Sequence, residues 1–107
     1  MTEHEYMTEV MRTCAATSAS EQLLLGAMGL AGESGEVVDL IKKARFQGHA
    51  LDMEKLQGEL GDVLWYLVLL CQVLGLSLTD VMAYNVAKMH RRYPNGFEAA
   101  RSQSRSE

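Results

Sequence analysis

Four carboxylates in this sequence have the types and spacing to bind a metal ion. Glu33 and Glu36 lie three residues apart, as do Glu59 and Asp62, so each pair shares one face of a helix. The pairs are equidistant from the midpoint between residues 47 and 48, so an antiparallel hairpin turning there brings them face to face. Converging acids repel one another and lose solvation unless a cation compensates. Because Mg²⁺ and Mn²⁺ prefer oxygen ligands, we predict a magnesium site, with Mn²⁺ as the alternative, and phosphate chemistry.

Two other interpretations of the acids are weaker. A solvated helix face commonly carries Glu-x-x-Glu, but the neighbours of these acids are small or apolar: Leu30, Ala31, Gly32, Val37, Leu60, Gly61 and Val63. A di-iron carboxylate bundle requires Glu-x-x-His on two helices. None of the three histidines, His4, His49 and His90, lies three residues after a glutamate. The oxygen-only set therefore favours Mg²⁺ or Mn²⁺.

A basic helix face could bind the phosphates of a substrate. Asn85, Lys88 and Arg92 are spaced i, i+3, i+7 and share one face. Cations of this kind near a magnesium cluster suit a polyphosphate. The alternative, a basic helix end that complements the helix dipole, accounts for Arg92 but less well for Asn85 and Lys88. Lys43 is a further candidate for a phosphate contact. Asp39, three residues after Glu36, could extend the acidic cluster, and a salt bridge to Lys42 or Lys43 is the alternative.

Four helices must position these residues. The first is expected over Glu3–Ala15, and a capping box of Ser18 and Glu21 opens the second, which runs to about Arg45. Asp52 is the predicted N-cap of the third, which runs to Leu74 and stops at Gly75, and the fourth runs from Ser77 to Arg92. No segment alternates with a period of two. We predict an all-α four-helix bundle whose antiparallel hairpin carries both acidic motifs, with one domain over residues 1–97 and a loose polar tail over 98–107.

The third helix also predicts self-association. It is apolar nearly all round from Val63 to Leu74, so it should be buried on every side, which a lone small bundle does not achieve. We therefore expect a homo-oligomer. Glycines recur every third position at 26, 29, 32 and 35, which favours close helix packing over a ligand contact. Core packing is likewise favoured for Trp65 and Tyr66, with stacking on a base as the alternative.

Composition excludes several classes of protein. The 107 residues suffice for one domain, and 48% are hydrophobic. A net charge of −4 argues against nucleic-acid binding. The longest apolar run, residues 63–76, is too short to cross a bilayer, and no signal peptide is visible, so we expect a protein without membrane contact in the cytoplasm. Cys14 and Cys71 form no metal-binding pattern and are expected to be buried free thiols.

Three segments together resemble the MazG-like, all-α nucleoside triphosphate pyrophosphohydrolases over about residues 20–97. The segments are GLAGESGEVVDLIKK, QGELGDVLWYL and NVAKMHRRYPNGF, and a 22-residue spacer, Val37 to Gly58, separates the two acidic motifs. The resemblance implies hydrolysis of a (d)NTP to the (d)NMP and pyrophosphate, with Mg²⁺ held by Glu33, Glu36, Glu59 and Asp62. It also implies substrate contacts by Asn85, Lys88, Arg92 and Tyr93, and a dimer or a dimer of dimers.

The predicted catalytic residues are Glu36 and Glu59. Glu36 is the first candidate to position or deprotonate the attacking water, although the choice among the four acids is open. The leading function is removal of non-canonical or surplus nucleotides. The alternatives are a phosphoribosyl-ATP pyrophosphohydrolase-like enzyme and a non-catalytic, metal-binding oligomeric helical module.

Overall fold

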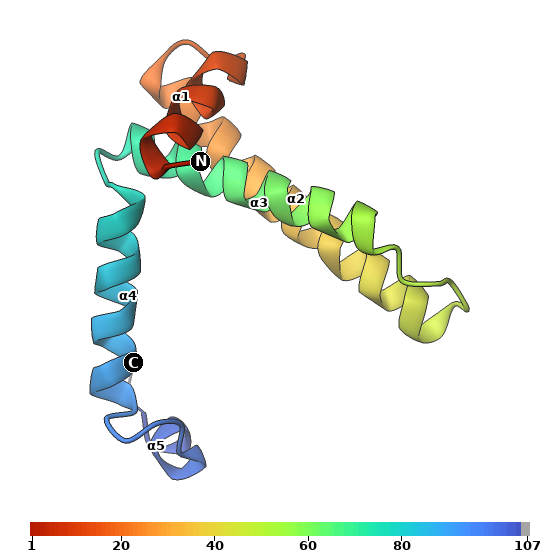
Figure 1. Cartoon of the computed structure of the whole chain (residues 1–107), viewed down its shortest axis with the longest axis vertical. Coiled ribbons are helices and arrows are strands. Elements are labelled where there is room, and N and C mark those ends of the chain that lie inside the picture. The colour runs from red at the N-terminus through yellow and green to blue at the C-terminus, as the bar shows by residue number, and fades with distance from the viewer. Residues whose placement is uncertain (106–107) are drawn as a thin grey trace. The chain divides into compact units, whose positions relative to one another are not determined.

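The computed structural model of the chain describes residues 1–105, and these form five helices (Figure 1). The helices are α1 (Glu3–Thr13), α2 (Ala19–Phe46), α3 (Met53–Val73), α4 (Leu78–Arg92) and α5 (Ala99–Gln103). Within the described residues there is no strand, only an isolated bridge between Pro94 and Gly96, which confirms the all-α prediction. No single helix in this range is long and apolar enough to span a membrane; only α3 and α4 taken together, across the break between them, reach that length and composition.

Side-chain caps set the start of the long helices as predicted. The N-caps Ser18, Asp52 and Ser77 accept hydrogen bonds from the backbone N–H groups of Glu21, Lys55 and Asp80 at 3.2, 3.1 and 3.0 Å. Such a cap contributes about 1 kcal/mol by satisfying a helix N–H that has no partner inside the helix. Just after α3, Gly75 has φ +70, a left-handed conformation that favours glycine and ends the helix.

The helices α2 and α3 form the predicted antiparallel hairpin and lie side by side along their length (Figure 1). Residues 47–52 join them, and Gly48 in this turn has φ +73. Close packing confirms the helix-packing interpretation for two of the glycines. A Cβ on Gly26 would lie 2.8 Å from Leu70, and one on Gly29 would collide with the ring of Tyr66. At Gly32 and Gly35 no neighbouring atom of the described chain lies within 4 Å of the corresponding position.

The residues Met1–Gly75 form one compact unit with a small core. Helix α1 packs on α3, and the buried apolar side chains are Val10, Val68, Leu69 and Cys71. Residues 63–74 are not buried on every side within the single chain, where Leu64 is 39% exposed and Leu74 is 56% exposed. This agrees with the apolar excess from which we expect a homo-oligomer, and the oligomer itself stays a prediction. Both cysteines are free thiols, as predicted, but only Cys71 is buried and Cys14 is half-buried.

A second unit begins at Leu76 and contains α4 and α5. Part of the loose tail that we expected over residues 98–107 is ordered, because Ala99–Gln103 is helical, while residues 106 and 107 lie outside the described residues. The Arg101 Nε donates to the backbone oxygen of Arg92 at 2.8 Å, which satisfies a carbonyl in the last turn of α4. Assembly of α4 with the first three helices into one four-helix bundle stays a prediction.

Candidate active site

The hairpin brings three of the four predicted metal ligands together. Glu33 on α2 and Glu59 and Asp62 on α3 each offer a carboxylate oxygen, and these oxygens all lie within 4.8 Å of one another. Glu33 and Glu59 are half-buried and Asp62 is exposed. We call these three residues the carboxylate cluster. Its geometry follows from the i, i+3 spacing on α3 and from the antiparallel register of α2 against α3.

Glu36 lies outside the carboxylate cluster. Its side chain is exposed, one helical turn after Glu33, and its carboxylate is not among the oxygens that converge. It is still close enough for its negative charge to raise the pKa of Glu33. The sequence predicts all four acids as metal ligands; the structure brings three of them together, and metal binding by Glu36 stays a prediction.

A bound cation would relieve the electrostatic repulsion within the carboxylate cluster. The pKa of Glu33 is raised to about 7, first by a hydrogen bond with Glu59, then by burial and by the negative charges of Glu59, Asp62 and Glu36. Without a counter-charge, and at a pH below about 7, Glu33 therefore holds a proton between carboxylates that would otherwise repel each other. A divalent cation supplies that counter-charge in place of the proton. An all-oxygen donor set of this kind fits Mg²⁺ or Mn²⁺.

Each of the four acids directly follows a glycine. These glycines are Gly32, Gly35, Gly58 and Gly61. At none of them does an atom from another segment of the unit Met1–Gly75 lie within 4 Å of where a Cβ would stand. Within this unit, the helix backbone at these four positions is therefore bare.

Lys43 forms a salt bridge with Asp39, which confirms the salt-bridge interpretation of Asp39. The Lys43 Nζ lies 2.8 Å from Asp39 Oδ2, and the Lys42 Nζ lies 3.4 Å from Asp39 Oδ1. The hydrogen bond from Lys43 is the main reason why the pKa of Asp39 is below its ordinary value. The same contact, with a smaller contribution from Glu36, raises the pKa of Lys43. Asp39 therefore forms salt bridges and does not join the carboxylate cluster, while a phosphate contact of Lys43 stays a prediction.

Two of the predicted substrate residues share a pocket on α4. Asn85 and Lys88 line a cavity of about 380 Å³. The other lining residues are Leu76, Asp80, Val81 and Tyr84. The sequence interpretation gave neither Asp80 nor Tyr84 a role in the site, although their spacing of four residues, continued by Lys88, is the signal that would have found them.

The remaining predicted substrate residues lie at the end of α4. Arg92 is its last residue, and Tyr93 follows as the C-cap. The Tyr93 ring is 5.3 Å from that of Phe97, and Tyr93 lines a separate cavity of about 350 Å³ together with His90 and Pro94. The structure thus groups Asn85 with Lys88 but places Tyr93 in a different pocket.

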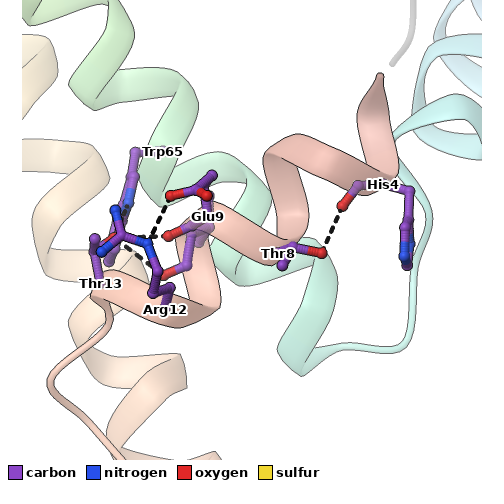
Figure 2. A network of polar contacts seen from close by, with 7 residues as sticks. His4, Thr8, Glu9, Arg12, Thr13 and Trp65 are labelled. Atoms are coloured by element: carbon purple, nitrogen blue, oxygen red, sulfur yellow. Dashed lines mark hydrogen bonds and ion pairs between the residues drawn. The ribbon is translucent and has the colours of Figure 1, made fainter. Parts of the chain in front are cut away.

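Helix α1 supplies a contact beside the carboxylate cluster that the sequence did not predict. Thr13, Asp62, Trp65 and Tyr66 line a cavity of about 280 Å³. The Trp65 indole N–H donates to the Thr13 Oγ1 at 3.0 Å (Figure 2). Burial and, to a smaller extent, the negative charge of Asp62 raise the pKa of the Tyr6 hydroxyl. Tyr6 also lies on α1. Because 52 residues separate Thr13 from Trp65, no local periodicity could reveal this contact.

Comparison with known proteins identifies the family. Residues 20–97 match the MazG nucleotide pyrophosphohydrolase domain, and this span contains the carboxylate cluster, Glu36 and the substrate candidates on α4. The chain belongs to the MazG family. MazG domains generally act as nucleotide pyrophosphohydrolases and typically depend on a divalent metal, with which the acidic cluster agrees. Helix α1 lies before the matched span.

A relative of this MazG chain is the gene 37 protein of Mycobacterium phage L5. The two are 38% identical over 73 residues, which is 64% of each chain. The MazG chain therefore spans just under two thirds of that relative, whose name states no activity. No solved structure matches the chain.

Proposed function

We propose that this MazG chain is a Mg²⁺-dependent nucleoside triphosphate pyrophosphohydrolase that hydrolyses a (d)NTP to the (d)NMP and pyrophosphate and so clears surplus or non-canonical nucleotides. One observation carries the proposal. Carboxylate oxygens from two facing helices, Glu33 on one and Glu59 and Asp62 on the other, converge within 4.8 Å inside the span that matches the family. Such a cluster is costly unless a cation compensates its negative charge.

The described residues suggest a division of roles. Glu33, Glu59 and Asp62 would hold Mg²⁺, with Mn²⁺ as a possible substitute. When bound, the ion would neutralise phosphate charge and lower the pKa of a water molecule. Glu36, whose carboxylate is outside the cluster, is available to position that water and accept its proton. Glu59 is the second candidate for this role.

The cationic and polar residues are assigned to the substrate. Asn85 and Lys88, which line one pocket, are proposed to bind phosphate oxygens, since an ammonium and an amide N–H both donate to them. Arg92, Tyr93 and Lys43 complete the proposed substrate set. In this assignment the side chains bind and orient the substrate and offset the charge that develops on the leaving pyrophosphate.

Pyrophosphate release from a panel of dNTPs tests the proposed function directly. We expect hydrolysis with Mg²⁺ or Mn²⁺ and none with a chelator. Phosphoribosyl-ATP belongs in the same panel, and exclusive hydrolysis of it would transfer the chain to the alternative activity. If neither ion supports hydrolysis of any nucleotide, the chain is better described as a non-catalytic metal-binding module.

The substitution Glu59→Gln tests the carboxylate cluster while keeping its shape. Loss of residues that merely orient metal ligands typically costs 10–100-fold, so removal of a ligand charge is expected to lower kcat/KM by about 100-fold or more. Weaker Mn²⁺ binding in calorimetry should accompany this loss. Glu54→Gln is the matched control, because Glu54 is exposed in the first turn of the same helix, outside the cluster. Equal activity in the two variants would remove Glu59 from the site.

A further inference from the structure

The cavity formed by Thr13, Asp62, Trp65 and Tyr66 adjoins the carboxylate cluster, because Asp62 belongs to both. We propose that this cavity is the subsite for the nucleobase of the substrate, with Trp65 as the surface on which the base stacks and Thr13 as the residue that positions Trp65. The inference rests on the proposed function. If the phosphates of a substrate lie at the carboxylate cluster, this cavity of the unit Met1–Gly75 lies beside them and can receive the base.

The size and lining of the cavity suit a single planar ring. Its volume of about 280 Å³ is just below the range of about 300–1,000 Å³ that is usual for whole ligands, so it fits a part of a nucleotide. The Trp65 and Tyr66 rings meet edge to face, with centroids 5.0 Å apart and planes at 77°. Bases stack on aromatic side chains whatever their identity, since every base has a π-face. Together the two rings offer a base a flat wall and a perpendicular one.

Contacts from two other helices hold these rings in place. The Trp65 N–H can only donate, and its bond to Thr13 Oγ1 fixes how the indole is turned. The Thr13 hydroxyl in turn donates to the backbone oxygen of Glu9 at 2.9 Å, as Figure 2 shows. On the other side, the Tyr66 ring lies against the bare backbone of Gly29. The subsite is therefore preorganised, which lowers the entropy cost of binding.

Helix α1 is thus a functional part of the site although it lies outside the residues that match the family. Thr13 acts through Trp65 and is a positioning residue. Loss of its hydroxyl should weaken binding of the base while leaving the chemistry at the phosphates intact. An inorganic tripolyphosphate has no base, so its binding should not depend on Thr13 or Trp65.

The test combines fluorescence and kinetics on the full chain. Trp65 is the single tryptophan, so its emission reports on this cavity alone. We expect the emission to change when a non-hydrolysable dNTP analogue is added with Mg²⁺. Thr13→Val and Trp65→Leu should each raise the KM for dNTPs by about 10-fold with kcat within about twofold, and leave inhibition by tripolyphosphate unchanged. Thr13→Ser, which keeps the hydroxyl, should restore the KM.

Thr8→Val is the matched control, because the Thr8 hydroxyl on the same helix donates to the backbone oxygen of His4 at 3.0 Å and not to a ring of the cavity (Figure 2). Its KM should equal that of the unmodified chain. The subsite is refuted if Thr13→Val and Trp65→Leu, both folded by circular dichroism, leave the KM unchanged, or if they weaken tripolyphosphate and dNTP equally. An emission that responds to protein concentration and not to nucleotide shows that a second copy covers the cavity, which also overturns the inference.

These outcomes separate the subsite from the proposed function. Hydrolysis of dNTPs with no effect of Thr13 or Trp65 leaves the function standing and removes the subsite. Absence of hydrolysis, with an emission change on adding a deoxynucleoside that Thr13→Val abolishes, keeps the subsite and removes the function.

Discussion

At the scale of single residues, Glu33 has the clearest measurable property. Its pKa of about 7 exceeds the ordinary value of 4.5, so the folded chain binds this proton more tightly than the unfolded chain. The unfolded state then holds fewer protons between these two values, and folding stability falls as pH rises through them. We predict that metal-free protein unfolds at a lower temperature at pH 8 than at pH 5.5, and that Mg²⁺ recovers much of the loss at pH 8.

The substitution Glu33→Gln isolates this effect from other titrating groups. The glutamine is neutral at both pH values, so the difference in melting temperature between pH 5.5 and pH 8 should shrink in the variant. Thermal unfolding followed by circular dichroism, with a chelator present, measures it. An unchanged pH profile in Glu33→Gln would show that Glu33 is not the group responsible.

A second residue-scale prediction concerns the two lysines that share Asp39. Exposed ion pairs contribute little to stability, so Lys43 can leave Asp39 for a phosphate at little cost. We expect Lys43→Gln to raise the KM for dNTPs several-fold. Lys42→Gln removes the other partner of Asp39 and should leave the KM near that of the unmodified chain. Equal KM values in both variants would restrict Lys43 to its salt bridge.

At the scale of elements, the packing of α2 on α3 predicts opposite effects for two glycines. Gly29→Ala places a methyl group into the ring of Tyr66, and such overpacking costs about 1–3 kcal/mol. Gly32→Ala meets no neighbouring atom, so the better helix propensity of alanine should add up to about 1 kcal/mol. Urea unfolding of metal-free protein measures both. A Gly29→Ala variant as stable as Gly32→Ala would contradict the hairpin packing.

The elements also show how far local sequence signals reach. The caps Ser18, Asp52 and Ser77 and the terminating Gly75 act within one helical turn, and for this reason they predicted the helix boundaries closely. Convergence of the cluster was predictable too, because it needs only helical spacing and a turn. Glu36 could not be separated from the other acids in this way, since its exact direction depends on how α2 is rotated against α3.

Contacts between distant segments were beyond the sequence. The Thr13–Trp65 hydrogen bond joins helices 52 residues apart, and nothing in either local pattern encodes it. The short helix α5 was missed for a related reason. Its polar sequence has no apolar periodicity, and it is fixed by the Arg101 contact to the end of α4.

At the scale of the whole molecule, the exposed apolar surface supports the proposed homo-oligomer. Large apolar side chains that stay exposed in the unit Met1–Gly75 include Leu24, Met28, Val38, Ile41, Leu60 and Leu64. Soluble monomers rarely leave this much apolar surface in water. We predict a mass of at least twice 11.9 kDa in light scattering coupled to size exclusion. A constant mass of one chain across micromolar concentrations would refute the oligomer.

The glycines that precede the four acids imply a trade-off between stability and activity. A helix interior loses about 1 kcal/mol for each glycine in place of alanine, so Gly32, Gly35, Gly58 and Gly61 together cost roughly 4 kcal/mol. That is a large share of the roughly 5–15 kcal/mol that holds a typical domain together. Replacing all four glycines by alanine should therefore stabilise the protein and raise its melting temperature. The same methyl groups would crowd the bare backbone beside the acids, so this more stable variant is expected to have a lower catalytic activity.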